Sequence, residues 1–181
     1  MDYENKAANY FGNIRHEMLE FLPKKLNTLL DVGCGEGNFA NFIKSKKTVE
    51  AWGIELMEEP AAKAMEKLDK VLVGACEENI KELPDNYFDV IFFNDVLEHF
   101  VDPYSVLKQM KQKLSPEGII VSSIPNVRYH RVIKRLLFNK DWKYTMDGVL
   151  DKTHLRFFTK KSIVKMYEDF EFCGTILPDR H

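Results

Sequence analysis

Cysteine is scarce in this chain of 181 residues, which contains only Cys34, Cys76 and Cys173. The three residues lie far apart, and none belongs to the C-x-x-C pair that is typical of zinc sites and redox centres. An odd number of separated cysteines is also a poor basis for a disulfide framework. We therefore expect reduced, mostly buried thiols and no metal site built from cysteine.

Surplus positive charge and long apolar runs are also lacking. The 26 Lys and Arg residues stand against 28 Asp and Glu, a formal charge of −2, without the basic footprint that contacts with nucleic acid require. No apolar run approaches the roughly 20 residues that span a bilayer, and residues 1–4 carry acid where a signal peptide carries base. We expect a cytoplasmic protein with no nucleic-acid partner and no membrane span.

The distribution of apolar residues predicts strands that alternate with helices. Apolar runs of strand length stand between segments with helical spacing or helix-forming composition. The expected strands are 28–32, 50–55, 71–73, 89–93 and 119–123, and the helices between them lie around 39–43, 60–70 and 102–114. Such alternation implies right-handed crossovers and a mostly parallel sheet covered on both faces. The expected fold class is α/β, a doubly wound α/β/α sandwich.

The two ends of the chain should add further elements to one domain, 1–181. A stripe with helical spacing runs through Tyr10, Ile14, Met18, Phe21 and Leu22. It predicts that residues 1–24 form a helical segment, closed by Pro23, against the main body. Ser115–Gly118 predicts a turn, Thr159 predicts the cap of a last helix, and 170–177 is expected to form a final strand.

Residues 127–138 combine helical spacing with local positive charge. The basic residues are Arg128, His130, Arg131, Lys134 and Arg135. A solvated helix face and a cap over the substrate both account for this pattern, and both interpretations stay open. We expect 125–158 to be a substrate-capping insertion.

Three glycines follow the first expected strand directly. Gly33, Gly35 and Gly37 allow a tight turn whose backbone N–H groups can approach a ligand closely. A dinucleotide fingerprint starting at Gly33 would need glycine at position 38, which is Asn38, and the Gly-Lys-Ser/Thr of a phosphate-binding P-loop is missing. Asp31, just ahead of the turn, instead places a carboxylate where it can hold a cationic amino group.

Glu55 is the second signal, at the end of the next expected strand and twenty residues after Gly35 (55 − 35 = 20). A carboxylate in this place can accept hydrogen bonds from both hydroxyl groups of a ribose. Together with Asp31 and the glycines, it predicts an adenosine-containing ligand with a cationic amino group.

At this point the sequence resembles a known family, the class I S-adenosylmethionine-dependent methyltransferases. Leu29–Gly37 looks like their first motif, and Phe88–Ile91, leading into Asp95–His99 and Asp102-Pro103, looks like their fourth-strand region. The resemblance covers nearly the whole chain and implies a Rossmann-like methyltransferase fold.

Two further segments, Ser123–Arg128 and Asp151–Thr159, resemble a bacterial subgroup linked to modification of sugars and cell-surface glycans. Related folds usually add an antiparallel seventh strand, yet this chain stops at His181, soon after the last expected strand. Either the sequence is truncated or the sheet lacks that strand. An uncovered sheet edge would favour pairing with another chain, so a homodimer is one expected partner.

The resemblance implies that S-adenosylmethionine is bound at the strand ends and released as S-adenosylhomocysteine. The residues implied in cofactor binding are Asp31, Gly33, Cys34, Gly35, Gly37, Glu55, Leu56, Cys76, Glu77, Asn94 and Asp95. Leu56 and the segment 75–77 should border the adenine, and Asn94 and Asp95 should lie near the sulfonium and the acceptor. Relatives frequently carry an acid where this chain has Ala75, so the adenine contacts depart from the pattern.

The acceptor is expected to be a small hydroxylated molecule such as a sugar, a nucleotide-sugar or a glycan precursor. An alcohol must lose its proton, and a histidine is suited to accept it. His154 is the expected base and Asp95 a second catalytic residue, with Tyr129, His130 and Arg156 also near the substrate. A structural role for His154, bonded to backbone, is the alternative.

Two other functions stay open. Asp95, Glu98 and His99 form a D-x-x-E-H cluster similar to the E-x-x-E-H pattern of quinone-biosynthesis O-methyltransferases, where it resembles a divalent metal site. A quinone-type acceptor is therefore an alternative, although capping and packing by Glu98 and His99 are favoured over a metal here. The other interpretation is that the chain is a cofactor-binding module without turnover.

Overall fold

The computed structural model describes residues 10–12 and 14–172, which fall into two compact units. The first, here called the sheet unit, contains the described residues of 7–96 together with Ser105–Ser123. The second unit contains Leu97–Tyr104 and the described residues of 124–181. Each unit is described by itself. The expectation of a single domain stays a prediction.

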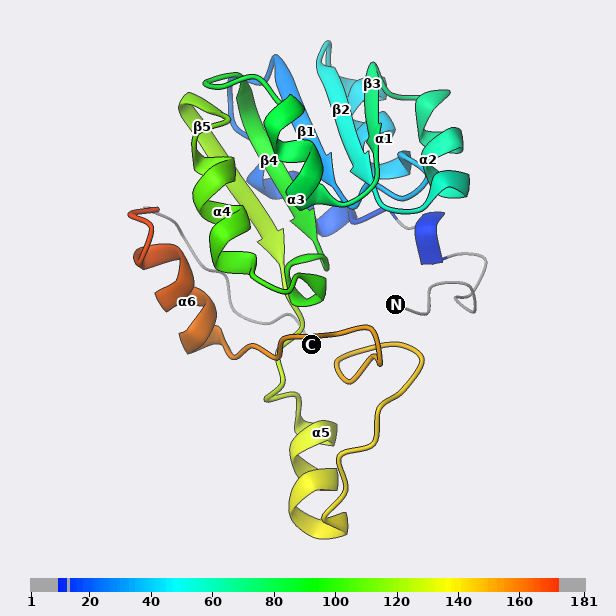
Figure 1. The fold of residues 1–181 in the computed structure, drawn as a ribbon, viewed down its shortest axis with the longest axis vertical. Coiled ribbons are helices and arrows are strands. Elements are labelled where there is room, and N and C mark those ends of the chain that lie inside the picture. The colour runs from blue at the N-terminus through cyan, green and yellow to red at the C-terminus, as the bar shows by residue number, and fades with distance from the viewer. Residues whose placement is uncertain (1–9, 13, 173–181) are drawn as a thin grey trace. The chain divides into compact units, whose positions relative to one another are not determined.

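A parallel five-stranded sheet forms the centre of the sheet unit (Figure 1). Its strands are β1 (Thr28–Val32), β2 (Glu50–Glu55), β3 (Lys70–Val73), β4 (Phe88–Asn94) and β5 (Leu114–Ser123). Their order is β3-β2-β1-β4-β5, and all four neighbouring pairs are parallel. The order reverses direction beside β1, which is the pattern of a doubly wound sheet. The predicted α/β fold class is confirmed.

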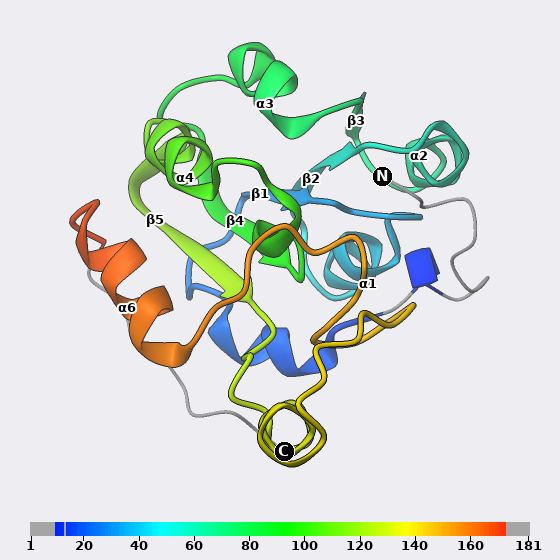
Figure 2. The same ribbon diagram turned by 60° about the horizontal axis from the view of Figure 1, so that its bottom comes forward.

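Helices connect the strands and cover the sheet. They are α1 (Asn38–Lys46), α2 (Glu58–Met65), α3 (Cys76–Asn79) with the 3₁₀ turn η3 (Ile80–Glu82), and α4 (Pro103–Lys111). In Figure 2, α1 lies on one face of the sheet and α3 and α4 lie on the other. Right-handed crossovers require this division, because the strand order runs one way from β1 to β3 and the other way from β3 to β5.

One apolar core lies between α1 and the sheet. Phe39 and Ile43 on α1 are buried in it, as are Val90 and Phe92 of β4. The two β4 residues are two positions apart and therefore face the same side of the sheet. The rings of Phe39 and Phe92 meet edge to face at 4.9 Å between centroids. This packing fixes the start of α1, and with it the glycine turn before it.

The N-terminal segment forms two short 3₁₀ turns where the apolar spacing predicted a longer helix. They are η1 (Tyr10–Gly12) and η2 (His16–Phe21), and residues 1–9 lie outside the described part of the chain. The carbonyl of Phe11 accepts a hydrogen bond from the amide of Glu36 at 2.9 Å, so a neighbour in space replaces a helical partner. Met18 of η2 still enters the core, as a residue packed against the main body should.

The expected turn at Ser115–Gly118 lies within β5 as an irregularity of the strand. Phe88 pairs with Leu114 but Val90 pairs with Ile119, so the strand carries extra residues between the two pairs. Gly118 permits this, because a Cβ atom there would lie 2.5 Å from the carbonyl oxygen of Phe88. A local turn signal and continued strand pairing therefore coexist through a bulge.

The second unit contains α5 (His130–Lys134), the π-helical turn η5 (Arg135–Asn139) and α6 (Lys160–Glu168). Thr159 caps α6 as predicted, through a reciprocal pair of hydrogen bonds with Ser162. The stretch 170–172, expected to begin a strand, forms a turn after α6, and 173–177 lies outside the described residues. Among the described helices, none has the length and apolar character needed to cross a bilayer.

Candidate functional site

Three polar side chains converge where neighbouring strands end. Asp31 lies near the end of β1, Glu55 ends β2 and Asn94 ends β4. Since β1 is hydrogen-bonded to both β2 and β4, these residues share the carboxyl edge of the sheet unit. Ligands of open parallel α/β sheets collect at this edge. The structure thus brings together three residues that the sequence predicted for the cofactor.

The glycine turn adopts the conformation for which glycine is needed. The φ angles of Gly33, Gly35 and Gly37 are 70°, 55° and 74°, in the left-handed region that side chains disfavour. The amides of Gly33 and Cys34 both donate to the carbonyl of Ile54 in β2, at 2.8 and 3.1 Å. The turn is therefore tied to the neighbouring strand and presents a fixed backbone.

Protein atoms occupy the space that side chains on the turn would need. A Cβ atom on Gly33 would lie 2.5 Å from the side chain of Val96, and one on Gly35 would collide with the carbonyl of Phe11. Neither contact could be predicted from the sequence, because a hydrophobic residue and a backbone carbonyl belong to no motif. Both Phe11 and Val96 nevertheless shape the candidate site.

Glu55 is buried and is held by two backbone amides, one in the glycine turn and one just after β2. One carboxylate oxygen accepts from the amide of Gly35 at 2.8 Å, and the other accepts from the amide of Met57 at 3.0 Å. Burial raises the pKa of Glu55, whereas the amides of Met57, Gly35 and Leu56 lower it. Each oxygen keeps a second lone pair, so the bonds to hydroxyl groups that the sequence predicted are still available.

Asp31 is a buried carboxylate with unusual electrostatics. Its pKa is raised to about 7, mainly by burial and secondly by the nearby charge of Glu55. A hydrogen bond from Asn94 acts in the opposite direction and lowers the pKa. The carbonyl oxygen of Asn94 is itself buried and has no hydrogen-bond partner among the described residues. Two acids beside an unsatisfied amide oxygen form a place that a cationic N–H donor would complete.

The two described thiols next to this site are buried and neutral. Burial raises the pKa of Cys34, as do the charges of Asp31 and Glu55, and burial also raises the pKa of Cys76. Cys34 fills the space above Gly53, where a Cβ atom would lie 2.5 Å from its sulfur. Both cysteines therefore pack rather than react, which fits the predicted reduced thiols.

The residues predicted to border the adenine lie after β2 and β3. Leu56 exposes 47% of its surface, which is unusual for a large apolar residue at the rim of a core. Glu77 is also exposed, in the first turn of α3. The aliphatic surface of Leu56 is suited to contact with a flat ring, and the carboxylate of Glu77 can accept N–H groups.

Asp95 follows β4 in a strained conformation. Its φ angle is 54°, which non-glycine residues rarely adopt. Its carboxylate accepts a hydrogen bond from the hydroxyl of Ser123 at 2.7 Å and forms an ion pair with Arg15. Ser123 and Arg15 are thus positioning residues that the sequence did not identify, and Asp95 is a held anion.

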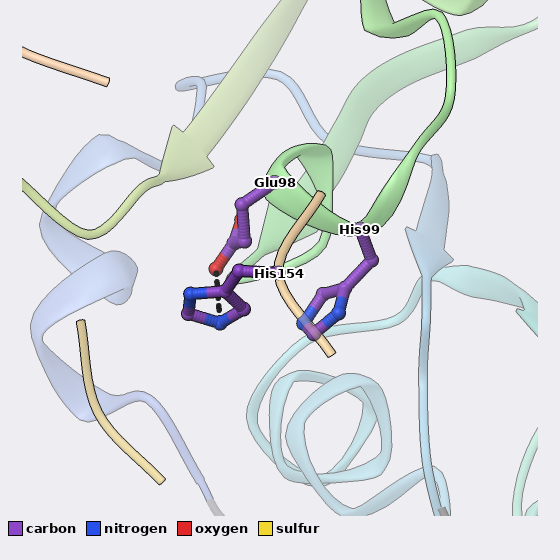
Figure 3. A group of neighbouring side chains, drawn as sticks. All are labelled: Glu98, His99 and His154. Carbon is purple, nitrogen blue, oxygen red and sulfur yellow. Dashed lines mark ion pairs between the residues drawn. The ribbon is translucent and has the colours of Figure 1, made fainter. Parts of the chain in front are cut away.

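In the second unit, a buried acid and two histidines form a compact group (Figure 3). Glu98 and His99 belong to the 3₁₀ turn η4 (Leu97–His99), and His154 comes from the loop before α6. The Nε2 atom of His154 lies 3.8 Å from Glu98, and the two imidazole rings meet edge to face at 4.8 Å. The sequence predicted roles for all three residues but did not predict that Glu98 and His154 meet.

Backbone carbonyls set the orientation of both imidazoles. The Nδ1 atom of His154 lies 3.1 Å from the carbonyl of Val149, and that of His99 lies 3.1 Å from the carbonyl of Thr153. Each Nδ1 therefore carries the proton in the neutral ring, which leaves the Nε2 lone pair to accept a proton or to bind a metal. The ligand atoms of the group lie within 4.8 Å of one another, and two nitrogens with one carboxylate would suit zinc better than magnesium.

The other residues predicted near the substrate have separate surroundings. The guanidinium of Arg156 donates to the carbonyl of Val101, a bond within the second unit. Tyr129 stands at the start of α5, and its ring lies 4.7 Å from the ring of His130. Their roles at the substrate stay predictions.

Curated relatives are named as methyltransferases. The part of each relative that this chain matches is shorter than the whole relative. A mitochondrial ubiquinone biosynthesis O-methyltransferase of Saccharomyces cerevisiae is 34% identical over 125 residues, which are 63% of this chain and 40% of that protein. A ubiquinone biosynthesis O-methyltransferase of Aliivibrio fischeri is 30% identical over 152 residues, 77% of this chain and 61% of that protein. The chain thus spans about half the length of these relatives.

Solved structures with a similar fold include S-adenosylmethionine-dependent methyltransferases. A S-adenosylmethionine-dependent methyltransferase of Archaeoglobus fulgidus matches 87% of this chain and 66% of its own with a TM-score of 0.69 at 22% identity. One of Aquifex aeolicus matches 86% and 77% with a TM-score of 0.61 at 21% identity. A family model described as a methyltransferase domain matches residues 4–174. This chain therefore belongs to the methyltransferase domain family.

Proposed function

We propose that this chain binds S-adenosylmethionine at the carboxyl edge of its sheet and methylates a hydroxyl group of a small molecule. The observation that carries the proposal is the buried pair of acids, Asp31 and Glu55, on the two sides of a glycine turn. The turn is expected to receive the methionine part of the donor. Asp31 would hold its ammonium group, and Glu55 would hold the ribose.

The chemistry of these residues fits that ligand. A buried carboxylate whose pKa is raised to about 7 gains most from a cation placed beside it. The buried carbonyl oxygen of Asn94 can accept one ammonium N–H group, which removes the cost of an unsatisfied polar atom. Leu56 and Glu77 would border the adenine. Both side chains are exposed.

The bound donor supplies an electrophilic methyl group, and its transfer to an alcohol breaks a carbon–sulfur bond, forms a carbon–oxygen bond and releases a proton. We propose that Nε2 of His154 takes this proton from the acceptor hydroxyl. Glu98 would stabilise the resulting imidazolium across the 3.8 Å that separates the two side chains. Nδ1 stays bonded to Val149 throughout, which keeps the ring oriented.

The ubiquinone biosynthesis relatives support O-methylation, and they and two segments of this chain point to different acceptors. Names that include ubiquinone biosynthesis O-methyltransferase favour a phenolic, quinone-type hydroxyl. The segments Ser123–Arg128 and Asp151–Thr159 resemble a subgroup linked to sugars, so a sugar, nucleotide-sugar or glycan precursor is the other candidate. In both cases the acceptor is a small molecule with a hydroxyl group.

Calorimetry with S-adenosylmethionine and S-adenosylhomocysteine tests the first half of the proposal. We expect saturable binding that is weakened at least about tenfold in Asp31→Asn, since a charge-assisted bond is lost. Asp69→Asn is the matched control, because Asp69 is an exposed acid of the same unit that is paired with Lys44. Folded protein without affinity for either compound would overturn the proposal.

Methyl release with a panel of catechols and of nucleotide-sugars tests the second half. We expect turnover with one class, and we expect His154→Gln to abolish most of it while leaving the affinity for S-adenosylhomocysteine unchanged. Full turnover in His154→Gln would remove only the base assignment. Tight donor binding without turnover on any acceptor would instead show a binding module.

A further inference from the structure

The tip of the second unit, residues 136–146, exposes an unusual amount of apolar surface. Of the thirteen large apolar side chains exposed among the described residues, six lie in these eleven positions. They are Leu136, Leu137, Phe138, Trp142, Tyr144 and Met146. Leu137 and Phe138 expose 65% and 79% of their surfaces. Exposed apolar side chains gathered in one short segment typically mark a binding surface.

Positive charge surrounds the tip although the whole chain is slightly acidic. The exposed cations are Arg128, Arg131, Lys134, Lys140 and Lys143, with Arg135 partly buried among them. Asp141 is the one acid between positions 128 and 146, so six cations minus one anion leave a charge of +5. The formal charge of the chain is −2, which gives the rest of the molecule −7 (−2 − 5). The basic charge is thus concentrated at the apolar surface.

The tip is a built structure that holds these side chains in place. The chain turns back after α5 (Figure 1), where Lys140 ends the π-helical turn in a left-handed conformation. Arg135 reaches Asp141 at 3.5 Å, and the ring of Trp142 packs edge to face on Phe157 at 5.3 Å. A single π-helical turn within a helix is rare and is found mostly at functional sites. The exposed residues are therefore presented by an ordered turn.

We propose that the tip is a docking surface for an anionic lipid bilayer. Leucine and phenylalanine gain free energy by entering the acyl boundary, and tryptophan and tyrosine favour the headgroup level. Lysine and arginine beside them attract acidic headgroups while their stems lie along apolar surface. A solvated helix face does not account for the exposure of Leu137 and Phe138, whereas insertion into a bilayer does. The tip shares no residue with the sheet unit that carries Asp31 and Glu55, so the proposal does not depend on methyl transfer.

Sedimentation of the full-length protein with lipid vesicles tests the proposal. We expect binding to vesicles of phosphatidylcholine mixed with phosphatidylglycerol, and much weaker binding to phosphatidylcholine alone. The double variant Leu137→Ser/Phe138→Ser should bind at least about tenfold more weakly, because it loses two apolar side chains that insert. Lys140→Gln and Lys143→Gln should each reduce binding about fivefold, and added salt should weaken the wild type.

Matched controls come from the sheet unit. Met65→Ser removes an exposed apolar side chain, and Lys47→Gln and Lys81→Gln remove exposed cations. These variants should bind vesicles like the wild type, and a thermal melt confirms that every variant is folded. Absence of binding to both kinds of vesicle, equal binding to both, or equal losses in the controls would overturn the proposal. The proposal would also be overturned if the protein does not bind vesicles but forms a dimer that the variant Leu137→Ser/Phe138→Ser dissociates. The tip would then bind a second copy of the chain.

Discussion

Asp31 shows at the scale of one residue how a ligand site opposes stability. The side chain is buried beside a second acid, and its pKa is raised to about 7. In the free protein near neutral pH, the carboxylate therefore ionises at a cost that a bound cation would offset. This cost makes two measurements informative.

The affinity for S-adenosylmethionine should fall as the pH is lowered below about 7. Below its pKa Asp31 is protonated, and the ammonium group of the donor can bind the carboxylate only after that proton has left. One released proton corresponds to a loss of up to about tenfold in affinity per pH unit. Calorimetry on both sides of pH 7 measures this slope, and Asp31→Asn should lack it. An affinity that does not change with pH would contradict the role of Asp31.

Asp31→Asn should raise the melting temperature of the free protein above neutral pH. A carboxyl group whose pKa rises from 3.8 to about 7 on folding stabilises the folded state below pH 3.8, and this contribution is lost as the pH rises through 7. The rise of the pKa from 3.8 to about 7 limits the gain in the free energy of unfolding of the variant to roughly 4 kcal/mol. Thermal melts at pH 8 and pH 5 should show a larger difference between variant and wild type at pH 8. An equal difference at both would contradict the assigned pKa.

Treatment with a chelator should leave the methyl-transfer activity unchanged if His154 acts as a base. The proposed proton acceptor is Nε2 of the imidazole, and Glu98, 3.8 Å away, would stabilise the charge without a metal. Activity is compared before and after dialysis against EDTA, with Glu98→Gln as the companion variant, which should shift the pH–rate profile. Loss of activity that added zinc restores would instead make Glu98, His99 and His154 metal ligands.

Gly35 shows at the scale of elements why the turn after β1 tolerates no side chain. Gly35→Ala should lower the free energy of unfolding by about 1–2 kcal/mol for its left-handed conformation alone, and the collision with the carbonyl of Phe11 should add to this. Displacement of the turn should also weaken donor binding. Urea unfolding and calorimetry measure the two effects.

Gly148→Ala is the matched control for that variant. Gly148 has a φ angle of 75°, close to that of the turn glycines, but nothing lies within 4 Å of the place of its Cβ atom. It should therefore show only the backbone cost, with unchanged affinity for the donor. If both variants lost stability and affinity equally, the contact with Phe11 would not matter.

Elements with regular patterns could be predicted from the sequence, and those shaped by contacts in space could not. β4 contains the apolar run Val90–Phe93, and Thr159 caps α6 through Ser162, so both elements could be predicted from the order of residues. The 3₁₀ turn η1 contains Phe11, whose carbonyl accepts a hydrogen bond from the amide of Glu36, and no local pattern encodes this contact. The bulge in β5 likewise depends on pairing with β4. In both cases a distant partner decided the local conformation.

The candidate site divides in the same way at the scale of the whole molecule. Asp31, the glycines and Glu55 could be predicted together because parallel strands place their carboxyl ends at one edge. The pair of Glu98 and His154 could not, since 56 positions separate the two residues (154 − 98 = 56). Arg15 beside Asp95 and the tip at 136–146 also become visible only in three dimensions.

The two tryptophans should report separately how the units respond to a ligand. Trp52 lies in β2 of the sheet unit and Trp142 lies in the second unit. S-adenosylhomocysteine at one hundred times its Kd should stabilise the part that binds it by about 2.7 kcal/mol. In Trp142→Phe, the fluorescence transition of Trp52 should therefore move to higher temperature. In Trp52→Phe the fluorescence comes from Trp142. If the ligand raised the transition temperature only in this variant, the donor site would lie in the second unit.

The described part of the second unit consists of two separate stretches of chain, with Ser105–Ser123 of the sheet unit between them in the sequence. The amides of Leu155 and Arg156 bond to the carbonyl of Glu98, and His99 meets Thr153, so the two stretches complete one another. Recombination between two genes anywhere in the codons for Ser105–Ser123 would separate the two stretches that form these hydrogen bonds. Such a unit cannot be gained or lost as a continuous cassette. A change in one stretch that alters these contacts therefore needs a matching change in the other stretch.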